Sequence, residues 1–424
     1  MTHPAAARPG TGSDSIRATK GARVQVDVPT LVLIPTIAAI APLATRAFGR
    51  WIAIPVVIFE IVLGIALGPS ALGWVQPDAF IELLSDFGLA MLFFLAGQEI
   101  DYEAIRGRPL ARASIGWAIS LVLGLAAGWF VEPDAGAVFI GIALTSTALG
   151  ALLPILRDAG LLRTPFGVSV LAIGAAGEFL PLIAISIFLS GRSPLHAAIV
   201  LLAFAVITGL AIWRASKGDG RRLHEAIAAT LHTSGQFAIR LVMLVLLALV
   251  GLSIVLDLDM LLGAFAAGVI ARLLLEGAPE SDRRTIEVKL DGIGFGVFVP
   301  IFFIYTGVTF DLEALFADTR TAVLLPLFTV LLLVVRGVPS ALLAPPGAPP
   351  HERVSTGLFG ATGLPIIVAV TAIGVEAGDL DSGTASALVG AGLLSLLLFP
   401  LTAIAITNRG SRRPRQESNL RPRD

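Results

Sequence analysis

Apolar runs long enough to cross a lipid bilayer recur along nearly the whole chain of 424 residues. A transmembrane helix needs about 20 mainly apolar residues, because the hydrocarbon core of a bilayer is about 30 Å thick. The composition, with 55% hydrophobic and only 14% charged residues, is far from that of a soluble domain. The sequence therefore predicts an all-α polytopic membrane protein with about 13 transmembrane helices.

The predicted spans are residues 31–45, 52–67, 81–96, 113–130, 137–155, 165–189, 195–213, 237–256, 260–275, 293–308, 321–343, 354–375 and 386–406. They divide into a first repeat at 30–190, a linker helix at 195–213 and a second repeat at 237–407. Two groups of six helices on either side of one linker helix would insert in opposite orientations, which is the inverted-repeat plan of many secondary transporters. Residues 1–29 are polar and predict a disordered N-terminal tail, and residues 408–424 predict a basic cytoplasmic tail.

The loops between these spans alternate between basic and non-basic. Lys and Arg gather around 46–50, 106–112, 157–163, 214–222 and 283–289, whereas the loops at 68–80, 131–136, 257–259 and 376–383 contain neither. Excess positive charge marks the cytoplasmic side. We therefore expect a multi-pass protein of the plasma membrane with its N-terminus outside and its C-terminus in the cytoplasm.

Two of the spans carry matching interruptions. The fifth contains Thr145, Ser146 and Thr147 followed by Gly150 and Pro154. The twelfth, which occupies the equivalent place in the second repeat, shows the same kind of break, at Thr362, Gly363 and Pro365. Backbone groups freed by breaks of this kind can coordinate a cation at the middle of the membrane. The pattern predicts two broken helices, although Gly and Pro are also common in ordinary membrane helices.

A single carboxylate, Glu178, lies in the middle of the apolar run 165–189. An ionisable group at that depth costs roughly 2.5–3.5 kcal/mol on insertion scales, and such groups usually mark ion or substrate pathways. Glu178 is therefore the leading candidate for binding a proton or a monovalent metal cation. The structural alternative is a protonated glutamate hydrogen-bonded inside a helix bundle.

Two further charges lie within predicted spans. Arg336, in the eleventh span, is a candidate charge partner for Glu178, or else it reaches to the lipid headgroups by snorkelling. Glu60, in the second span, is a secondary candidate for the site, with a structural hydrogen-bonding role or a place on the entry route as the favoured reading.

Several classes of function are disfavoured by composition. The chain has no cysteine, five histidines and a net charge of −1. Disulfides and thiolate chemistry are therefore absent, a histidine-built metal site is not expected, and no basic face is left over for nucleic acid. We expect neither an enzyme nor a bound cofactor.

Four motifs resemble those of bacterial monovalent cation:proton antiporters, the superfamily of sodium/proton antiporters and Kef-type potassium efflux systems. They are EIVLGIALGPSALG at 60–73, FFLAGQEID at 93–101, GAFAAG at 263–268 and PIFFIYTG at 300–307. The resemblance implies a homodimer in membrane lipid and a moving core that carries the two broken helices, which cross at mid-membrane. It also implies that Glu178 replaces the ion-binding aspartate and Arg336 the basic residue of the partner helix. Gly177 departs from the acidic or amide residue that precedes the aspartate in the family, and Arg336 departs from the lysine of its electrogenic members.

The expected function is exchange of Na⁺ or K⁺ for H⁺, electroneutral, by competition at the one carboxylate of Glu178, with hydroxyls or carbonyls near Thr145 to Leu149 as further ligands. The alternative within transport is a carrier of organic anions on a similar inverted-repeat fold, in which Arg336 would anchor the substrate. A channel is disfavoured because no run resembles a carbonyl selectivity filter.

Overall fold

The computed structural model describes residues 27–49, 55–100, 105–189, 194–217, 230, 236–275, 278–317 and 319–418. The predicted tail at 1–29 therefore lies outside the described residues up to residue 26. In the described part the elements are α1 (Val28–Gly49), α2 (Val56–Leu67), α3 (Ala79–Glu99), α5 (Arg108–Val131), α6 (Gly136–Ala143), α7 (Leu149–Asp158), α8 (Pro165–Phe188), α9 (Pro194–Lys217), α11 (Phe237–Val255), α12 (Met260–Leu275), α13 (Glu280–Ile293), η1 (Gly294–Phe298), α14 (Val299–Val308), α15 (Leu312–Phe316), α16 (Thr319–Leu332), η2 (Leu333–Gly337), α17 (Val338–Leu342), α18 (Pro350–Gly360), α19 (Pro365–Ala377) and α20 (Ser382–Ser418).

The all-α membrane architecture is confirmed. Within the described ranges, nine helical segments, one of them interrupted between α18 and α19, are long and apolar enough to cross a membrane, and α2, α9 and α12 contribute shorter apolar helices. The short helices α6 and α7 together occupy the predicted fifth span. The number of thirteen spans, the division into repeats and the linker role of α9 remain predictions.

One predicted span is shorter than the helix that contains it. The sequence places its start at residue 293, whereas helix continues back to Glu280 through the polar segment of α13. Hydropathy locates only the part of a helix that lies in hydrocarbon, so a polar extension is invisible to it. Glu280 and Asp282 lie in the first turn of α13, where negative charge favours a helix N-terminus, and this explains why the polar segment is helical.

Glycines of the sequence motifs are points of close helix contact. A Cβ atom on Gly64 of α2 would lie 2.3 Å from the carbonyl oxygen of Ile304 in α14, and one on Gly268 of α12 would lie 2.0 Å from that of Phe94 in α3. Such distances are too short for any side chain. Direct backbone packing thus joins α2 to α14, through the motifs at 60–73 and 300–307, and α3 to α12, through the motifs at 93–101 and 263–268. Small residues have the same effect in other membrane helix pairs.

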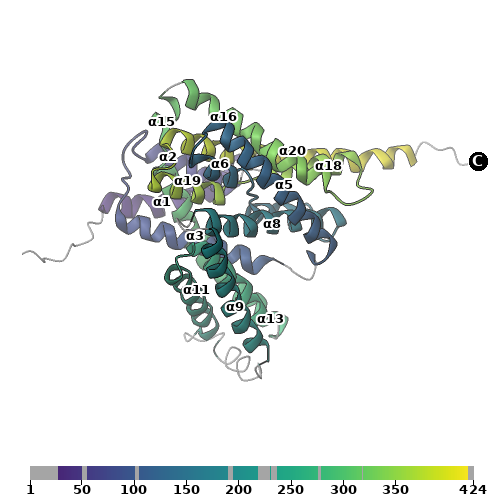
Figure 1. The fold of residues 1–424 in the computed structure, drawn as a ribbon, viewed down its shortest axis with the longest axis horizontal. Coiled ribbons are helices and arrows are strands. Elements are labelled where there is room, and N and C mark those ends of the chain that lie inside the picture. The colour runs from purple at the N-terminus through teal and green to yellow at the C-terminus, as the bar shows by residue number, and fades with distance from the viewer. Residues whose placement is uncertain are drawn as a thin grey trace, which may run out of the picture.

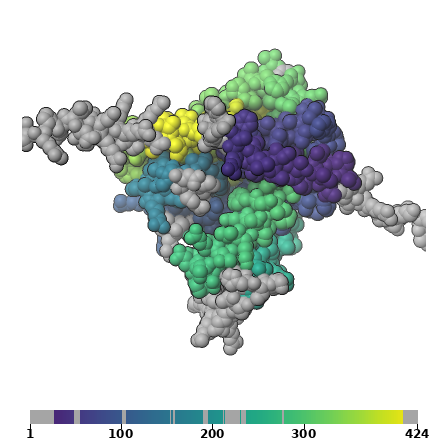
Figure 2. Space-filling model, turned by 180° about the vertical axis from the view of Figure 1, so that it is seen from behind, coloured from purple at the N-terminus to yellow at the C-terminus, as the bar shows by residue number. Residues whose placement is uncertain are grey.

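The helices around α9, α11 and α13 project from one end of the molecule, whereas α15 and α16 lie at the opposite end (Figure 1). Figure 2 shows α1, in purple, exposed along one face beside the green residues of α13 and α14. Between these ends, α8 packs against α5, α7 and α18, so the helix that carries Glu178 lies among the broken helices.

A polar cluster ties the end of α5 to the starts of α16 and α20. Glu132 forms an ion pair with Arg320 at 3.6 Å, and the hydroxyl of Thr384 lies 3.3 Å from Glu132 Oε1. Burial, followed by the neighbouring Asp381 carboxylate, raises the pKa of Glu132 to about 7. Hydrogen bonds from the Thr384 side chain and backbone lower the pKa of Asp381 in spite of its partial burial. One carboxyl of the pair therefore holds its proton more readily than the other, which lets two acids lie side by side.

Candidate functional site

The two broken helices meet at their interruptions. The first break, between α6 and α7, covers Leu144 to Ala148, and the second, between α18 and α19, covers Ala361 to Leu364. The backbone N–H of Ala148 donates to the carbonyl of Thr362 at 2.8 Å, which joins the two breaks directly. Interrupted backbone is thereby satisfied inside the protein, the condition under which it is tolerated at membrane depth.

A proline in α8 helps to join the first break to the candidate carboxylate. Pro181 has no N–H, so the carbonyl of Gly177 loses its helical hydrogen bond. The backbone N–H of Thr147 donates to that carbonyl instead, at 3.0 Å. The segment GAAGEFLP therefore contains both the Glu178 carboxylate and the Gly177 carbonyl, whose hydrogen bond from Thr147 holds the first break beside α8.

Glu178 is 4% exposed and lies against the N-terminus of α7. Its Oε1 atom accepts a hydrogen bond from the backbone N–H of Gly150 at 3.3 Å, and the N–H of Leu149 also interacts with the carboxylate. The free N–H groups and the positive end of a helix dipole favour an anion at this place. Its other oxygen, Oε2, has no hydrogen-bond partner among the described residues.

An oxygen of this kind is costly to bury unless it is protonated or binds a cation, since an unsatisfied buried acceptor loses its hydration. The arrangement therefore holds one oxygen of Glu178 in place and leaves the second available. A carboxylate oxygen of this kind can bind a proton or a metal cation.

Arg336 lies in η2 and is 1% exposed, which places it within the protein. Its Nε donates to Thr147 Oγ1 at 3.0 Å and its Nη2 donates to the carbonyl of Ile173 at 2.8 Å. In the part of the chain that the structure describes, it makes no ion pair with Glu178. This burial is inconsistent with a side chain that snorkels to the lipid headgroups. The role of charge partner for Glu178 remains a prediction, and in that role the charge of Arg336 would act on Glu178 across the backbone of Gly177.

Gly177 makes room for the guanidinium. A Cβ atom on this residue would lie 2.7 Å from Arg336 Nη2 and 2.5 Å from Thr147 Oγ1. The two departures from the family pattern are thus linked in space, because a glycine at 177 leaves the space that Arg336 occupies.

The π-helical turn η2 has an identifiable cause. Pro339, two residues after it, cannot donate to the carbonyl of Val335, and the backbone widens before the proline. Single π-helical turns are frequent at functional sites of membrane and soluble helices alike. Here the turn contains Arg336 itself.

The three predicted hydroxyl ligands are all buried, and each donates a hydrogen bond to a backbone carbonyl. Thr145 Oγ1 donates to Ile142 at 2.7 Å and Ser146 Oγ donates to Ala143 at 2.9 Å, each to a carbonyl of α6. Thr147 Oγ1 donates to the carbonyl of Gly360 at 2.7 Å, a hydrogen bond that links the first break to α18, and it accepts from Arg336. Among the described residues the hydroxyl oxygens of Thr145 and Ser146 accept no hydrogen bond, so their lone pairs are available to a cation, whereas Thr147 Oγ1 already accepts from Arg336.

The remaining predicted positions fall at or after the breaks. Gly150 is in the first turn of α7 and donates to Glu178, while Pro154 lies further along the same helix. Gly363 lies within the second break, where its N–H donates to Ser395 Oγ at 3.1 Å, and Pro365 begins α19. Thr362 supplies the carbonyl that joins the breaks.

Two other acidic residues, Glu60 and Glu99, differ in how close they lie to Glu178. Glu60 is 3% exposed in α2, a helix that packs mainly against α1 and α14. Glu99, at the C-terminal end of α3, instead lies close enough to Glu178 to interact with it electrostatically. The sequence analysis missed Glu99. Its signal was an acid directly after an apolar span, in the motif FFLAGQEID, which reads equally well as the polar end of a membrane helix.

Comparison with known proteins places this geometry in a family. A Na⁺/H⁺ antiporter of Enterococcus hirae is 24% identical over 384 residues, covering 88% of this chain and 95% of its own length. The Na⁺/H⁺-K⁺ antiporter GerN of Bacillus cereus is 26% identical over 273 residues, covering 61% of this chain and 66% of its own. The Bacillus subtilis protein YjbQ is 25% identical over 397 residues, and the chain spans 62% of its length.

Among solved structures, the sodium proton antiporter MjNhaP1 of Methanocaldococcus jannaschii matches with a TM-score of 0.64 and 14% sequence identity, covering 90% of this chain and 96% of the other. At that identity the match shows a shared fold. The family model described as "Sodium/hydrogen exchanger, transmembrane" matches residues 36–409, nearly the whole membrane part. The chain is therefore a member of the sodium/hydrogen exchanger family.

Proposed function

We propose that this protein is a secondary antiporter that exchanges a monovalent cation, Na⁺ or K⁺, for H⁺ across the plasma membrane. The observation that carries the proposal is the buried Glu178 carboxylate, with one oxygen held by the N-terminus of α7 and the other without a hydrogen-bond partner among the described residues. The names of the relatives, Na⁺/H⁺ and Na⁺/H⁺-K⁺ antiporters, supply the two candidate cations.

Competition at one carboxylate produces the coupling. Oε2 of Glu178 binds either a proton or a cation, so the cation enters only after the proton has left. Carbonyl and hydroxyl oxygens of the first break, at Thr145 and Ser146, are the proposed additional ligands, since hard cations prefer oxygen. The hydrogen bond from Gly150 persists in both states and keeps the carboxylate oriented.

Arg336 has a supporting role in this scheme. Two of its donors are used by Thr147 and Ile173, both of which hold the first break and α8 together. An arginine stays protonated, so it supplies a constant positive charge near the site and takes no part in proton exchange. Its engagement with protein groups also favours the exchanger over an organic-anion carrier, in which the guanidinium would be needed for substrate.

We expect exchange to be electroneutral, with one cation for one proton. Reconstituted, acid-loaded proteoliposomes should release protons when Na⁺ or K⁺ is added, and the reversal point should not move when valinomycin clamps the membrane at different potentials. A carried net charge would instead couple to voltage by about 2.3 kcal/mol per 100 mV. A voltage-dependent reversal point would contradict the one-carboxylate scheme. It would implicate Glu99, the acid that interacts with Glu178, as a second proton carrier.

We also propose that the N-terminus lies outside and the C-terminus in the cytoplasm, because the basic loops alternate with loops free of Lys and Arg. The chain has no cysteine, so single cysteines report topology cleanly. In intact cells Ala71→Cys and Ala377→Cys, both at exposed positions, should react with an impermeant maleimide, and Ser281→Cys in α13 should react only after permeabilisation. The reverse labelling pattern would overturn this orientation. Gly218, a natural choice for an inner loop, lies outside the described residues.

A homodimer in the lipid bilayer is part of the same proposal. It follows from the family resemblance, and α1 offers a suitable surface, since Val32, Ile40 and Leu43 are among its exposed large apolar side chains.

A further inference from the structure

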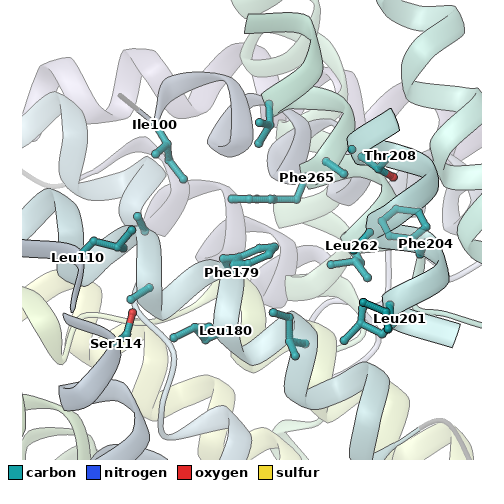
Figure 3. A pocket seen from close by; sticks show the side chains of 18 of the residues that line it. Ile100, Leu110, Ser114, Phe179, Leu180, Leu201, Phe204, Thr208, Leu262 and Phe265 are labelled. Carbon is teal, nitrogen blue, oxygen red and sulfur yellow. The ribbon is translucent and has the colours of Figure 1, made fainter. Parts of the chain in front are cut away.

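A large cavity lies beside the helix that carries Glu178, between α8 and α5 on one side and α9 and α12 on the other (Figure 3). Its volume is about 760 Å³, within the range of roughly 300–1,000 Å³ of sites that hold small organic molecules. Phe179 of α8 and Phe265 of α12 stack at its centre, with ring centroids 5.3 Å apart.

The lining is almost wholly apolar. Among its residues, Ser114 and Thr208 carry the polar side chains, and the rest are aliphatic, aromatic or glycine. A hydrated cation or a charged solute would lose its hydration there without replacement. The cavity is therefore suited to hydrocarbon.

The cavity also opens toward the part of the surface that faces lipid. Leu202 of α9 lines it and is 64% exposed, and the neighbouring Ile199 and Val206 on the same helix are 59% and 60% exposed. These residues belong to a helix that is apolar from Leu195 to Leu210. In a membrane protein, an exposed apolar surface of this kind suits contact with lipid acyl chains.

Two basic residues belong to a segment that lines the cavity. Ile105 and Leu110 are lining residues, and Arg106 and Arg108, which stand between them in the chain, are both exposed. Basic residues next to a membrane attract anionic headgroups. The apolar cavity and the arginine pair together match the two parts of a phospholipid.

We propose that an anionic phospholipid binds here, with one acyl chain in the cavity between α8 and α9 and its phosphate at Arg106 and Arg108. The acyl chain gains little hydrophobic free energy by leaving one apolar medium for another, so the charge of the headgroup supplies the selectivity. Each arginine should contribute about fivefold to the preference for an anionic over a zwitterionic lipid, the factor that corresponds to ~1 kcal/mol for one basic residue near a membrane surface.

Photochemical labelling tests the acyl-chain part. The purified full-length protein in detergent would be given phosphatidylglycerol with a diazirine in its acyl chain, and labelled peptides would be mapped by mass spectrometry. We expect labelling concentrated in the cavity-lining parts of α8, α9 and α12. The variant Ala205→Phe, which places a ring in the cavity from α9, should reduce the labelling at least about fivefold, since the ring occupies part of the volume that the chain needs.

The matched control is Ala203→Phe, two residues away on the same helix, exposed and outside the cavity lining. It should leave the labelling unchanged. Equal labelling in Ala205→Phe and Ala203→Phe, or labelling spread evenly over all lipid-facing helices, would overturn the proposal.

The headgroup part is tested by titration in native mass spectrometry, with phosphatidylglycerol compared with phosphatidylcholine. Arg106→Gln with Arg108→Gln should remove most of the preference for the anionic lipid, whereas Arg163→Gln, an exposed arginine outside the cavity, should keep it. A preference unchanged by the double variant would contradict the headgroup assignment. If Leu202→Cys formed disulfide-linked dimers while lipid labelling was absent, the occupant would be a second copy of the chain and the lipid proposal would fail. These measurements detect lipid directly, so their outcome does not depend on whether the protein exchanges cations.

Discussion

Glu178→Gln should reduce cation:proton exchange to the background of empty liposomes, while the protein still folds and inserts. Glutamine keeps the size of the side chain and an oxygen that can accept from the N–H of Gly150, so the contact with α7 is preserved. It cannot bind a proton or offer negative charge to a cation. The measurement is cation-induced pH change in proteoliposomes, with insertion and thermal unfolding of the purified variant recorded in parallel.

The matched control is Glu60→Gln, which removes a second buried carboxylate of the membrane part from α2, a helix that packs mainly against α1 and α14. It should retain appreciable exchange. Full exchange by Glu178→Gln would remove the proposed site. Glu178→Asp should give intermediate activity, because a side chain one methylene shorter still carries the charge but moves away from Gly150.

Arg336→Gln should destabilise the protein more than any surface arginine variant. It removes the charged hydrogen bonds to the carbonyl of Ile173 and to Thr147, and each hydrogen bond to a charged group contributes about 1.5–3 kcal/mol. Because these bonds join η2 to α8 and to the first break, we also expect exchange to fall. Thermal unfolding of the purified protein, followed by size-exclusion chromatography of heated samples, gives the measurement.

Arg353→Gln is the control for that variant, since Arg353 is on the surface and its Nε donates to the carbonyl of Ala348 at 3.1 Å. A surface change of this kind usually alters stability by less than about 0.5 kcal/mol. Arg336→Lys should fall between the two, because it keeps the charge but not the planar set of donors. Equal melting temperatures for Arg336→Gln and Arg353→Gln would show that the buried hydrogen bonds do not contribute as described.

The sequence predicts much of this architecture because the bilayer imposes a simple rule on it. Apolar runs of membrane length mark the helices, and polar or helix-breaking residues inside such runs stand out. Glu178, Arg336 and the breaks near Thr147 and Gly363 were identified in this way, and the structure brings both breaks together beside α8. Their chemical roles remain proposals.

What the sequence does not reveal depends on contacts between distant segments. The N-terminus of α7 faces Glu178 through Gly150, 28 positions away, and no periodicity encodes that contact. The fit of Arg336 beside Gly177 joins residues from opposite halves of the chain. Glu99 was missed for a similar reason, since its proximity to Glu178 follows from how α3 crosses the site and not from its place at the end of an apolar run.

The central claim is that a proton and a cation compete for Glu178. It is tested most directly by calorimetric titration of the purified protein with Na⁺ and with K⁺ in buffers of different ionisation enthalpy, which counts the protons released for each cation bound. The account predicts one proton released per cation at pH values where the free site is protonated, and neither binding nor release in Glu178→Gln. Cation binding that releases no proton over the pH range of transport, or binding that persists in Glu178→Gln, would contradict it.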